Sequence, residues 1–466
     1  MLTEVSWRRP RRNYYLLCMI KKIFLTSFYL LFSLSCVSFA DFTDIEYSWY
    51  RDSVLNLQNQ WLTNGYWDGA YGVENNITRA EILTILLRAS NITLPEVSTD
   101  KCFPDVDPNM WYHRYICAAS ILGIANGFSD GKFKPNDSVT TLEALAFANK
   151  AFQTGISTTG EKWYDLLQQF ADENNIMETH TYTTSTKISR GKSAELIIRF
   201  QEFKRTNSPL SYKSTGCNVS SQSMSSEVTL TIAGKERQFN LYVPNSYSNS
   251  REYSLVIATH GRTNSKDQVQ KYMDLDKWQS DTIIAYPAWL RSTSGGSFSW
   301  SEKENMTFID AILKHVSDNY CVNRNQVYAV GHSLGGWMAQ RIACLRGEFM
   351  SGLAVVGSGG FNGACSWPVP SLFFQNVDDH LSSYASGISA RNARIKVNEC
   401  DESSTENIQI GSLTCTKYNK CSTGNEVVWC EGYTGYNGDP HSWPTGGGWQ
   451  SPGSGTWILD YFRKQQ

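Results

Sequence analysis

The fold can be worked out from Gln326-Val-Tyr-Ala-Val-Gly-His-Ser-Leu-Gly-Gly-Trp-Met-Ala-Gln340. A short run of apolar β-forming residues leads into Gly-x-Ser-x-Gly, and the residues that follow have the composition of a helix. Strand, sharp turn and helix are the setting in which this motif presents a nucleophilic serine. Gly331 and Gly335 lack the Cβ atoms that would block so tight a turn. The stretch predicts Ser333 as a nucleophile, held where the start of a helix favours developing negative charge.

A serine nucleophile on such a turn needs an acid and then a histidine further along the chain. Only His380 and His441 follow Ser333. His380 comes directly after the best acid candidates, too close in sequence for one of them to orient it. His441 lies in Gly438-Asp-Pro-His-Ser-Trp-Pro444, a turn-rich loop able to bring an imidazole over the nucleophile. We therefore predict His441 as the general base.

The acid should follow the second strand after the elbow. Phe373-Phe-Gln-Asn-Val-Asp-Asp379 ends in two adjacent carboxylates at this place. Asp378 and Asp379 are both candidates, and the one that is not used would cap the turn. The predicted role of the acid is to hold the tautomer of the histidine and to stabilise its imidazolium form.

An oxyanion hole requires two N–H donors aimed at the developing negative charge. The backbone N–H of Leu334 is one predicted donor, because it directly follows the nucleophile. The second should come from the loop after the apolar strand at 255–258, through the N–H of Arg262 or of Thr263. His260 in the same loop is expected to be structural.

The rest of the second half supports a parallel sheet with helices on both faces. Residues 228–243 alternate as a hairpin would, and 283–286 is a second short buried strand. Residues 308–319 have a helical pattern, and 372–374 is another apolar strand. Residues 217–466 are therefore predicted to form one α/β domain.

Composition excludes some functions. At 466 residues the chain is too long for one ordinary domain, and its net charge of −2 gives no electrostatic basis for binding nucleic acid. No Cys-x-x-Cys pair or Cys/His cluster has zinc spacing, so we predict no metal and no other cofactor. Trp300 and Trp337 flank the predicted catalytic stretches, where they would stack on an aromatic acyl group or a sugar ring, or else pack in the core.

Residues 1–40 have the features of an export signal. Two lysines precede an apolar stretch at 23–37, and Ser38-Phe-Ala40 supplies small residues for cleavage. Met19 would begin a shorter signal of more ordinary length. Two alternatives stay open: the stretch is retained as a membrane anchor, or Cys36 is lipidated. No membrane contact is expected after cleavage.

The cysteines favour disulfides. Of the 12 cysteines, Cys18 and Cys36 lie in the signal segment, which leaves ten. An even, generous number suits disulfides in an exported chain. Cys102 and Cys117 flank one predicted helix start and are expected to pair. The eight cysteines of 217–466 allow 105 pairings, and the sequence does not choose among them.

Three imperfect repeats fill residues 41–205. Their ranges are 42–90, 103–153 and 161–205. Phe42-Thr-Asp-Ile45 with Trp49-Tyr50 recurs as Phe103-Pro-Asp-Val106 with Trp111-Tyr112, and the third copy keeps only Trp163-Tyr164. Each copy continues into a helical stretch, a turn and a second helix.

The second helix of each repeat is opened by a matching segment. The openers are Ile77-Thr-Arg-Ala-Glu81, Val139-Thr-Thr-Leu-Glu143 and Ile188-Ser-Arg-Gly-Lys192. In the first two, Thr followed three residues later by Glu is a capping box. Arg79 and Arg190 occupy the same place in their repeats, whereas the second repeat has Thr141 there.

At these residues the segment resembles a triplet of S-layer homology domains, specifically in the first two copies and weakly in the third. The resemblance implies an all-helical module that binds a secondary cell-wall polymer in grooves between repeats, through Arg79 and Arg190. The alternative is that these arginines only contact an acidic first helical turn. Thr141 implies that one groove is weak or absent. Residues 206–216, which are polar with Pro and Gly, are expected to be a linker.

Residues 217–466 resemble the secreted feruloyl esterases and the polyhydroxybutyrate depolymerase-type esterases. The matching segments include Gly234-Lys-Glu-Arg-Gln-Phe239, Thr307-Phe-Ile-Asp310, Cys321-Val-Asn-Arg324 and Val327-Tyr-Ala-Val-Gly-His-Ser333, and a tail with Cys415, Cys421, Cys430 and His441 that matches feruloyl esterases especially. The resemblance implies an α/β-hydrolase fold. It also selects Asp379 as the acid, because the acid of this group ends a His-Gly-Thr-x-Asp-like segment. Gln375 and Asn376 replace the His and Gly, and Asn305 stands where Asp is usual.

We therefore predict a secreted, wall-attached serine carboxylesterase that removes ester-linked substituents from plant polysaccharide. A polyhydroxybutyrate depolymerase, which acts on a polyester, and an acetyl xylan esterase are alternatives within the same chemistry. The alternative from another class is a surface-binding protein whose hydrolase domain is a relic. An intact Ser, Asp and His in the required order argues against the relic.

Overall fold

A computed structural model describes residues 41–158, 162–177, 185–219, 225–277, 279–289, 302–360, 363, 365, 367–444 and 453–465. The expected export signal at 1–40 and Trp300 lie outside the described residues. In the described ranges, no helix is both long and apolar enough to cross a bilayer.

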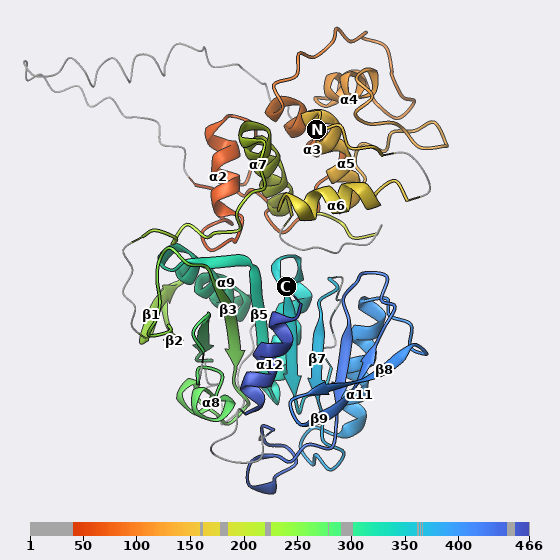
Figure 1. Cartoon of the computed structure of the whole chain (residues 1–466). Helices are drawn as coiled ribbons and strands as arrows, with labels where there is room; N and C mark the ends of the chain where they lie inside the picture. Colours follow the sequence, from red (N-terminus) through yellow and green to blue (C-terminus); the bar gives the residue numbers. More distant parts are fainter. Residues whose placement is uncertain are drawn as a thin grey trace, which may run out of the picture. The chain divides into compact units, whose positions relative to one another are not determined.

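The three repeats form three pairs of helices (Figure 1). The first helices are α2 (Arg51–Asn59), α4 (His113–Ile121) and α6 (Asp165–Glu173), and the second helices are α3 (Arg79–Ala89), α5 (Thr141–Phe152) and α7 (Arg190–Thr206). The predicted capping boxes are present at the starts of α3 and α5, where Glu81 and Glu143 accept from the N-cap backbone. Ser189 caps α7 alone, because Lys192 cannot accept a hydrogen bond.

The three opener segments meet in a closed ring. Isolated backbone bridges join Asn76 to Ser189, Thr78 to Ser138, and Thr140 to Lys187, so that each opener pairs with both others. The second helices start from this ring, and their first turns therefore lie against neighbouring repeats. Each repeat therefore packs against both others, as expected for repeats that cannot bury their apolar faces alone.

The second half is built on a ten-stranded sheet with the order β1-β2-β4-β3-β5-β6-β7-β10-β9-β8. The strands are β1 (Ser226–Ile232), β2 (Lys235–Tyr242), β3 (Tyr253–Thr259), β4 (Thr282–Pro287), β5 (Val322–His332), β6 (Gly352–Val356), β7 (Ser371–Phe374), β8 (Thr405–Ile410), β9 (Leu413–Tyr418) and β10 (Val427–Cys430). Strands β4, β3, β5, β6, β7 and β10 are parallel, and antiparallel strands complete both edges.

Helices cover both faces of this sheet, as the sequence predicts. Alternate residues of β3 face opposite cores: Leu255 and Ile257 face one, and Val256 and Ala258 face the other. The first core contains residues of α9 (Glu302–Asn319), α10 (Leu334–Leu345) and α11 (Tyr384–Val397). The second contains residues of α8 (Lys266–Met273) and α12 (Ser454–Arg463). A strand buried on both faces reads as a continuous apolar run, which is why β3 is legible in the sequence.

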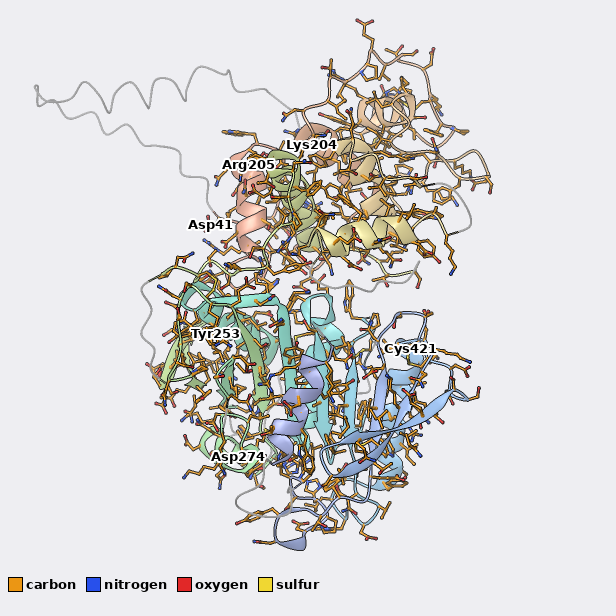
Figure 2. All side chains as sticks on the ribbon, viewed as in Figure 1. Asp41, Lys204, Arg205, Tyr253, Asp274 and Cys421 are labelled. Carbon is orange, nitrogen blue, oxygen red and sulfur yellow. A yellow bond between two sulfur atoms is a disulfide. The ribbon has the colours of Figure 1, made fainter. Side chains whose placement is uncertain are left out.

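Five disulfides join the ten cysteines beyond the signal segment. The expected Cys102–Cys117 bridge is present, and the other four are Cys217–Cys321, Cys344–Cys365, Cys400–Cys421 and Cys415–Cys430. The last two hold the β8–β9–β10 end of the sheet, where Figure 2 labels Cys421.

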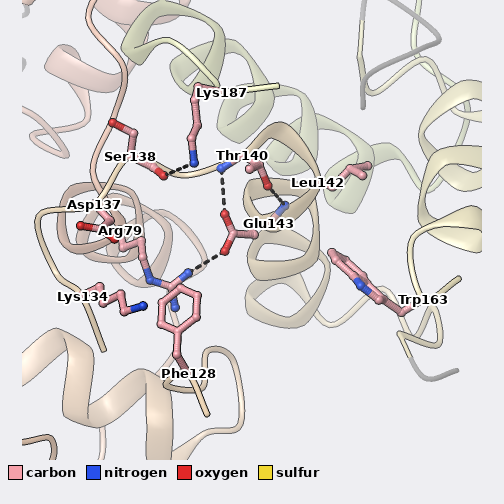
Figure 3. A pocket seen from close by; sticks show the side chains of 10 residues that line it. All are labelled: Arg79, Phe128, Lys134, Asp137, Ser138, Thr140, Leu142, Glu143, Trp163 and Lys187. Carbon is pink, nitrogen blue, oxygen red and sulfur yellow. Dashed lines mark hydrogen bonds and ion pairs between the residues drawn. The ribbon is translucent and has the colours of Figure 1, made fainter. Parts of the chain in front are cut away.

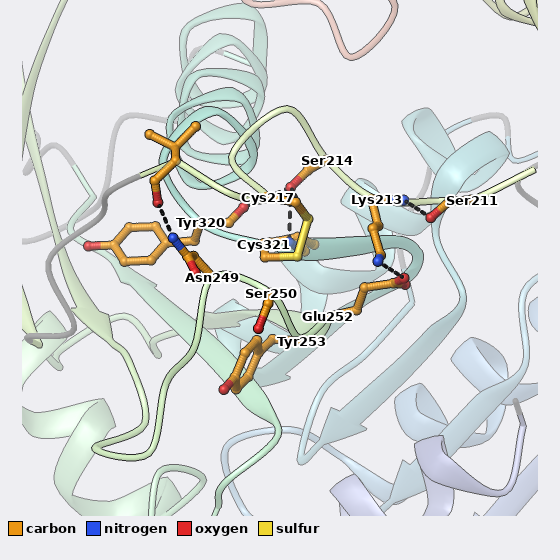
Figure 4. The surroundings of a disulfide bond; sticks show 12 residues. Ser211, Lys213, Ser214, Cys217, Asn249, Ser250, Glu252, Tyr253, Tyr320 and Cys321 are labelled. Carbon is orange, nitrogen blue, oxygen red and sulfur yellow. Dashed lines mark hydrogen bonds and ion pairs between the residues drawn. A yellow bond between two sulfur atoms is a disulfide. The ribbon is translucent and has the colours of Figure 1, made fainter.

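The expected linker at 206–216 is more closely held than its composition indicates. Lys213 pairs with Asn323 at the start of β5, and the Ser214 hydroxyl donates to the Tyr320 carbonyl at 2.7 Å. A Cβ at Gly216 would lie 2.4 Å from the Tyr320 nitrogen, so only glycine fits there. The Cys217–Cys321 disulfide follows at once (Figure 4). Polar composition marks the connection but does not show that tertiary contacts fix it.

The helical repeats also contact the 3-10 turn η1 (Gly347–Phe349), which follows α10. The Phe349 ring stacks on Trp49, with centroids 4.9 Å apart. The buried Glu348 carboxylate accepts from the Ser189 hydroxyl at 3.1 Å, and its backbone carbonyl accepts from the Lys192 ammonium at 2.7 Å. The start of α7 is therefore a point of contact between the two halves of the chain.

Candidate active site

The elbow around Ser333 has the strained geometry that its motif predicts. Ser333 has φ 56° and ψ −125°, a conformation that non-glycine residues adopt only where the surroundings enforce it. Its N–H donates to the Val356 carbonyl at 2.9 Å, and α10 begins at the next residue. A Cβ at Gly331 would lie 2.2 Å from the Gly335 carbonyl oxygen, and one at Gly335 would lie 2.1 Å from the Thr259 carbonyl oxygen. A side chain at either position would therefore clash with neighbouring backbone, so both positions require glycine.

His441 lies between the two residues predicted as its partners. Its Nε2 is 2.9 Å from Ser333 Oγ, and its Nδ1 is 2.9 Å from each carboxylate oxygen of Asp379. A carboxylate only accepts, so Nδ1 carries the proton and Nε2 is the acceptor for the serine hydroxyl. Asp439 accepts from the backbone N–H of His441 at 2.9 Å and holds the loop.

Asp379 follows β7, the second strand after the elbow, and it is buried. Its Oδ1 accepts from the N–H groups of Leu381 and Ser382 at 2.9 and 2.8 Å. Burial raises the pKa of this carboxyl, but the hydrogen bonds from His441 and from these backbone groups outweigh it and hold the pKa below its ordinary value. Asp378 is exposed. The structure therefore brings Asp379, and not Asp378, against His441.

Gln375 is a site residue whose part sequence reasoning did not recognise. Its side-chain amide donates to the Ser382 carbonyl at 2.7 Å and lies 3.3 Å from Asp379 Oδ2. It stands where related esterases were expected to have His. In the sequence, Gln375 is visible only as a departure from the His expected at this position. The folded structure is needed to show that its amide contacts the Asp379 carboxylate.

The two segments that carry the predicted oxyanion donors both adjoin Ser333. Leu334 is the first residue of α10, and the N–H at this position has no acceptor within a helix. The loop after β3 comes close on the other side, because a Cβ at Gly261 would lie 3.3 Å from Ser333 Cβ. Arg262 and Thr263 follow in this loop and are exposed. Their role as the second donor remains a prediction.

Trp337 and His260 lie on segments that adjoin Ser333. Trp337 is half-buried on α10, and the Arg341 guanidinium lies 5.2 Å from its ring centroid. This contact suits a packing role at least as well as a substrate-binding role. His260 is buried and directs Nδ1 at the Gly261 carbonyl at 2.8 Å, as expected of a structural histidine.

Arg79 and Arg190, predicted to bind a wall polymer, are buried ion-pair partners in the repeats. Arg79 Nη1 lies 2.9 Å from Glu143, and its Nε donates to the Phe133 carbonyl at 3.0 Å. Arg190 Nη1 lies 2.6 Å from Glu81. Each of these two residues is only 4% exposed. The arginines therefore join the start of one second helix to the start of another, which leaves little surface for a ligand to contact.

The third junction of the ring keeps its backbone bridge but has no arginine–glutamate pair. By the same geometry, the residue at the arginine position of repeat two would face the glutamate position of repeat three. Those positions hold Thr141 and Lys192, and Thr141 is fully buried. The absence of an arginine is thus matched by the absence of its carboxylate.

A pocket of about 400 Å³ lies over the Arg79–Glu143 pair (Figure 3). Its wall combines aromatic rings and cations, among them Phe128, Trp163, Lys134 and Lys187. The Arg79 guanidinium lies 4.7 Å from the Phe128 ring centroid, which orders that side of the pocket. Aromatic faces beside exposed ammonium groups suit an acidic saccharide.

One group of potential metal ligands occurs among the described residues, formed by Cys102, His113 and Cys117. The two cysteines are joined as a disulfide, so neither offers the thiolate that binds a metal. His113 Nε2 instead lies 3.0 Å from the Asp100 carbonyl.

Comparison with known proteins separates the two halves. The S-layer homology domain family matches residues 38–83 and 103–145. A cell surface protein of Thermoanaerobacter kivui is 35% identical over 133 residues, which are 27% of this chain and 18% of that protein.

The second half is similar to fungal enzymes. Feruloyl esterase D of Neurospora crassa is 27% identical over 216 residues, 43% of this chain and 74% of that protein. Feruloyl esterase C of Emericella nidulans is 26% identical over 218 residues, 44% of this chain and 77% of that protein. Among solved structures, an acetyl xylan esterase from Aspergillus awamori covers 51% of this chain and 99% of its own, at 14% identity and a TM-score of 0.37.

Proposed function

We propose that this chain, which carries S-layer homology repeats and a feruloyl esterase-like α/β-hydrolase domain, removes hydroxycinnamoyl groups from plant polysaccharide at the cell surface. The observation that supports the chemistry is the hydrogen-bonded series Ser333, His441 and Asp379, with 2.9 Å between successive partners. The repeats associate the enzyme with the cell surface.

The geometry supports an acyl-enzyme mechanism. Ser333 Oγ attacks the ester carbonyl while its proton passes to His441 Nε2. The backbone N–H of Leu334 and one N–H of the Gly261–Thr263 loop stabilise the tetrahedral oxyanion. The imidazolium then protonates the alcohol that leaves. Water, activated by His441, hydrolyses the acyl-enzyme and restores the serine.

Throughout this cycle Asp379 stays ionised. Its carboxylate holds the proton on Nδ1 and offsets the charge of the imidazolium. The lowered pKa of Asp379 is consistent with this role. Every step uses side chains and backbone of the chain itself together with water.

The names of the relatives and the surroundings of the site support an aromatic acyl group. Val377 and Leu381, two residues on either side of Asp379, are 54% and 70% exposed. Tyr436, close in sequence to His441, is 51% exposed. Three exposed apolar side chains on the segments that carry Asp379 and His441 would suit a substrate with an apolar part.

We further propose that the wall polymer binds at the junctions that keep an arginine–glutamate pair. The pocket over Arg79 and Glu143 supports this, because Lys134 and Lys187 can neutralise acidic groups on a saccharide that stacks on Trp163. The guanidinium of Arg79 would shape the pocket rather than provide its main contact.

The test is hydrolysis of methyl ferulate, acetylated xylan and a short-chain hydroxyalkanoate polyester by the purified chain. The wild-type chain is expected to hydrolyse methyl ferulate. Ser333→Ala should lower kcat by on the order of 10⁴-fold or more. Activity confined to acetate esters would reassign it as an acetyl esterase, and activity confined to the polyester as a depolymerase. Failure of Ser333 to react with a fluorophosphonate would support the relic alternative.

A further inference from the structure

The residue before the nucleophile, His332, makes two hydrogen bonds that the mechanism above does not use. It is buried at the end of β5, and its Nε2 lies 2.7 Å from the backbone carbonyl of His441. A carbonyl can only accept, so Nε2 must carry the proton of the neutral ring. Nδ1 is then an acceptor, and it faces the Tyr272 hydroxyl at 3.1 Å. The tautomer of His332 is thus fixed by its neighbours.

Tyr272 connects His332 to the loop of the catalytic histidine by a second contact. It lies near the end of α8, and its ring centroid is 6.2 Å from that of Trp443, two residues after His441. The His332 ring centroid also lies 6.2 Å from that of Trp443. The two residues therefore contact the His441 loop both through its backbone and through its tryptophan.

The direction of both hydrogen bonds is determined. The tyrosine O–H donates to Nδ1, and Nε2–H donates to the His441 carbonyl. The series joins α8 to the segments that supply the nucleophile and the base. Because these segments come from different parts of the chain, their relative positions depend on side-chain contacts of this kind.

We propose that Tyr272 and His332 are positioning residues, which hold the His441 loop in register with Ser333. The inference rests on the proposed esterase function. Neither side chain acts directly on the reacting atoms, because His332 binds the backbone of His441 and Tyr272 binds His332.

The series requires a neutral His332. Protonation would place hydrogen on Nδ1 as well, and the buried tyrosine proton would then have no acceptor. The charged groups near the His332 ring have opposite effects on its protonated form. A protonated His441 disfavours that form, whereas Asp379 and Asp439 favour it. Burial is the largest effect and lowers the pKa of His332 to about 4, so that the ring is neutral at ordinary pH.

The test compares Tyr272→Phe with a matched control, Tyr242→Phe. Tyr242 is a partly buried tyrosine of β2 whose hydroxyl donates to the Gln279 carbonyl at 3.0 Å, outside the site. Tyr272→Phe is expected to lower kcat for 4-nitrophenyl acetate roughly threefold to tenfold with little change in KM, as loss of one buried hydrogen bond predicts. The rate of inactivation by a fluorophosphonate should fall by the same factor. The control should change neither rate, although it also loses a hydrogen bond.

A second variant tests whether Tyr272 acts through His332. His332→Phe keeps a ring of similar size but removes both the donor to the His441 carbonyl and the acceptor for Tyr272. The double variant is expected to be no slower than His332→Phe alone. Fully additive losses, or wild-type inactivation by fluorophosphonate in Tyr272→Phe, would overturn the proposal. If Tyr272→Phe unfolds under assay conditions, wild-type kcat in His332→Phe would overturn it. A wild-type chain that does not react with the fluorophosphonate at all would instead refute the proposed function.

Discussion

At the scale of single residues, burial and hydrogen bonding separate groups that the sequence leaves equivalent. Asp378 and Asp379 are adjacent carboxylates on one turn, but only Asp379 is buried against His441. The order nucleophile, acid, histidine could be predicted from the motif. The choice between the two acids came from a family resemblance, since position in the sequence alone permits either.

Asp379→Asn should therefore impair catalysis far more than Asp378→Asn. An asparagine at 379 can donate to Nδ1 and so stabilise the wrong tautomer of His441, which costs about 10³–10⁴-fold in kcat. Asp378→Asn changes an exposed group and should leave kcat within about twofold of wild type. Steady-state kinetics on a soluble ester measure both. The opposite ranking would place the acid one residue earlier.

The lowered pKa of Asp379 predicts a pH-dependent contribution to stability. Because the folded-state pKa is below the unfolded value, ionised Asp379 stabilises the fold above the unfolded pKa, and this contribution is lost as pH falls through the folded pKa. The Tm of wild type should exceed that of Asp379→Asn most near neutral pH, and the difference should shrink below about pH 4. Thermal melts of both proteins from about pH 7 to pH 3 measure this. A difference that is constant across the range would contradict it.

At the scale of elements, the sequence predicts features that depend on neighbouring residues, but not contacts between residues far apart in the chain. The capping boxes of α3 and α5 follow from three-residue spacing, and β3 follows from an unbroken apolar run. The Arg79–Glu143 pair spans 64 residues, and the Tyr272–His332 contact spans 60. Such pairings depend on how the elements pack, which spacing along the chain does not encode. Arg79 was accordingly predicted as a ligand contact, whereas the structure buries it in an ion pair.

This placement predicts different effects for Arg79 and Lys134, which line the same pocket. Arg79→Ala leaves Glu143 without its partner and should cost on the order of 2–4 kcal/mol in stability of the repeats, at the lower end because Glu143 is 27% exposed. Lys134→Ala removes an ion pair with the exposed Asp130 and a contact with the Phe128 ring, and should cost about 1 kcal/mol or less. Denaturant unfolding monitored by circular dichroism distinguishes them.

Binding to cell walls should depend on the lysines of the pocket, although they contribute little to the stability of the repeats. Sedimentation with sacculi that retain their secondary polymer should weaken in a Lys134→Ala, Lys187→Ala double variant that is as stable as wild type. Equal sedimentation with sacculi stripped of the polymer would show that the repeats recognise something else.

At the scale of the whole molecule, the third repeat differs from the other two where it meets the hydrolase domain. Lys192 stands at the position that closes a capping box in the other repeats, and its ammonium donates to the Glu348 carbonyl. The Glu348 carboxylate is buried beside it; burial raises its pKa, which the charges of Lys192 and Arg346 oppose. The lysine that stands where the other repeats have glutamate thus supplies a cation to a buried carboxylate of the hydrolase domain.

Lys192→Met tests this link, with Lys187→Met as its control. Methionine keeps the apolar length of the side chain but removes a buried donor and a compensating charge, which should destabilise the contact by about 1–3 kcal/mol. Lys187 lies five residues earlier, is exposed, and donates to the Ser138 carbonyl within the repeats. Differential scanning calorimetry should show a lower Tm for Lys192→Met than for Lys187→Met, and faster proteolysis in the connection at 207–211. If both variants melt and are cleaved like wild type, the contact through Glu348 contributes nothing to holding the two halves together.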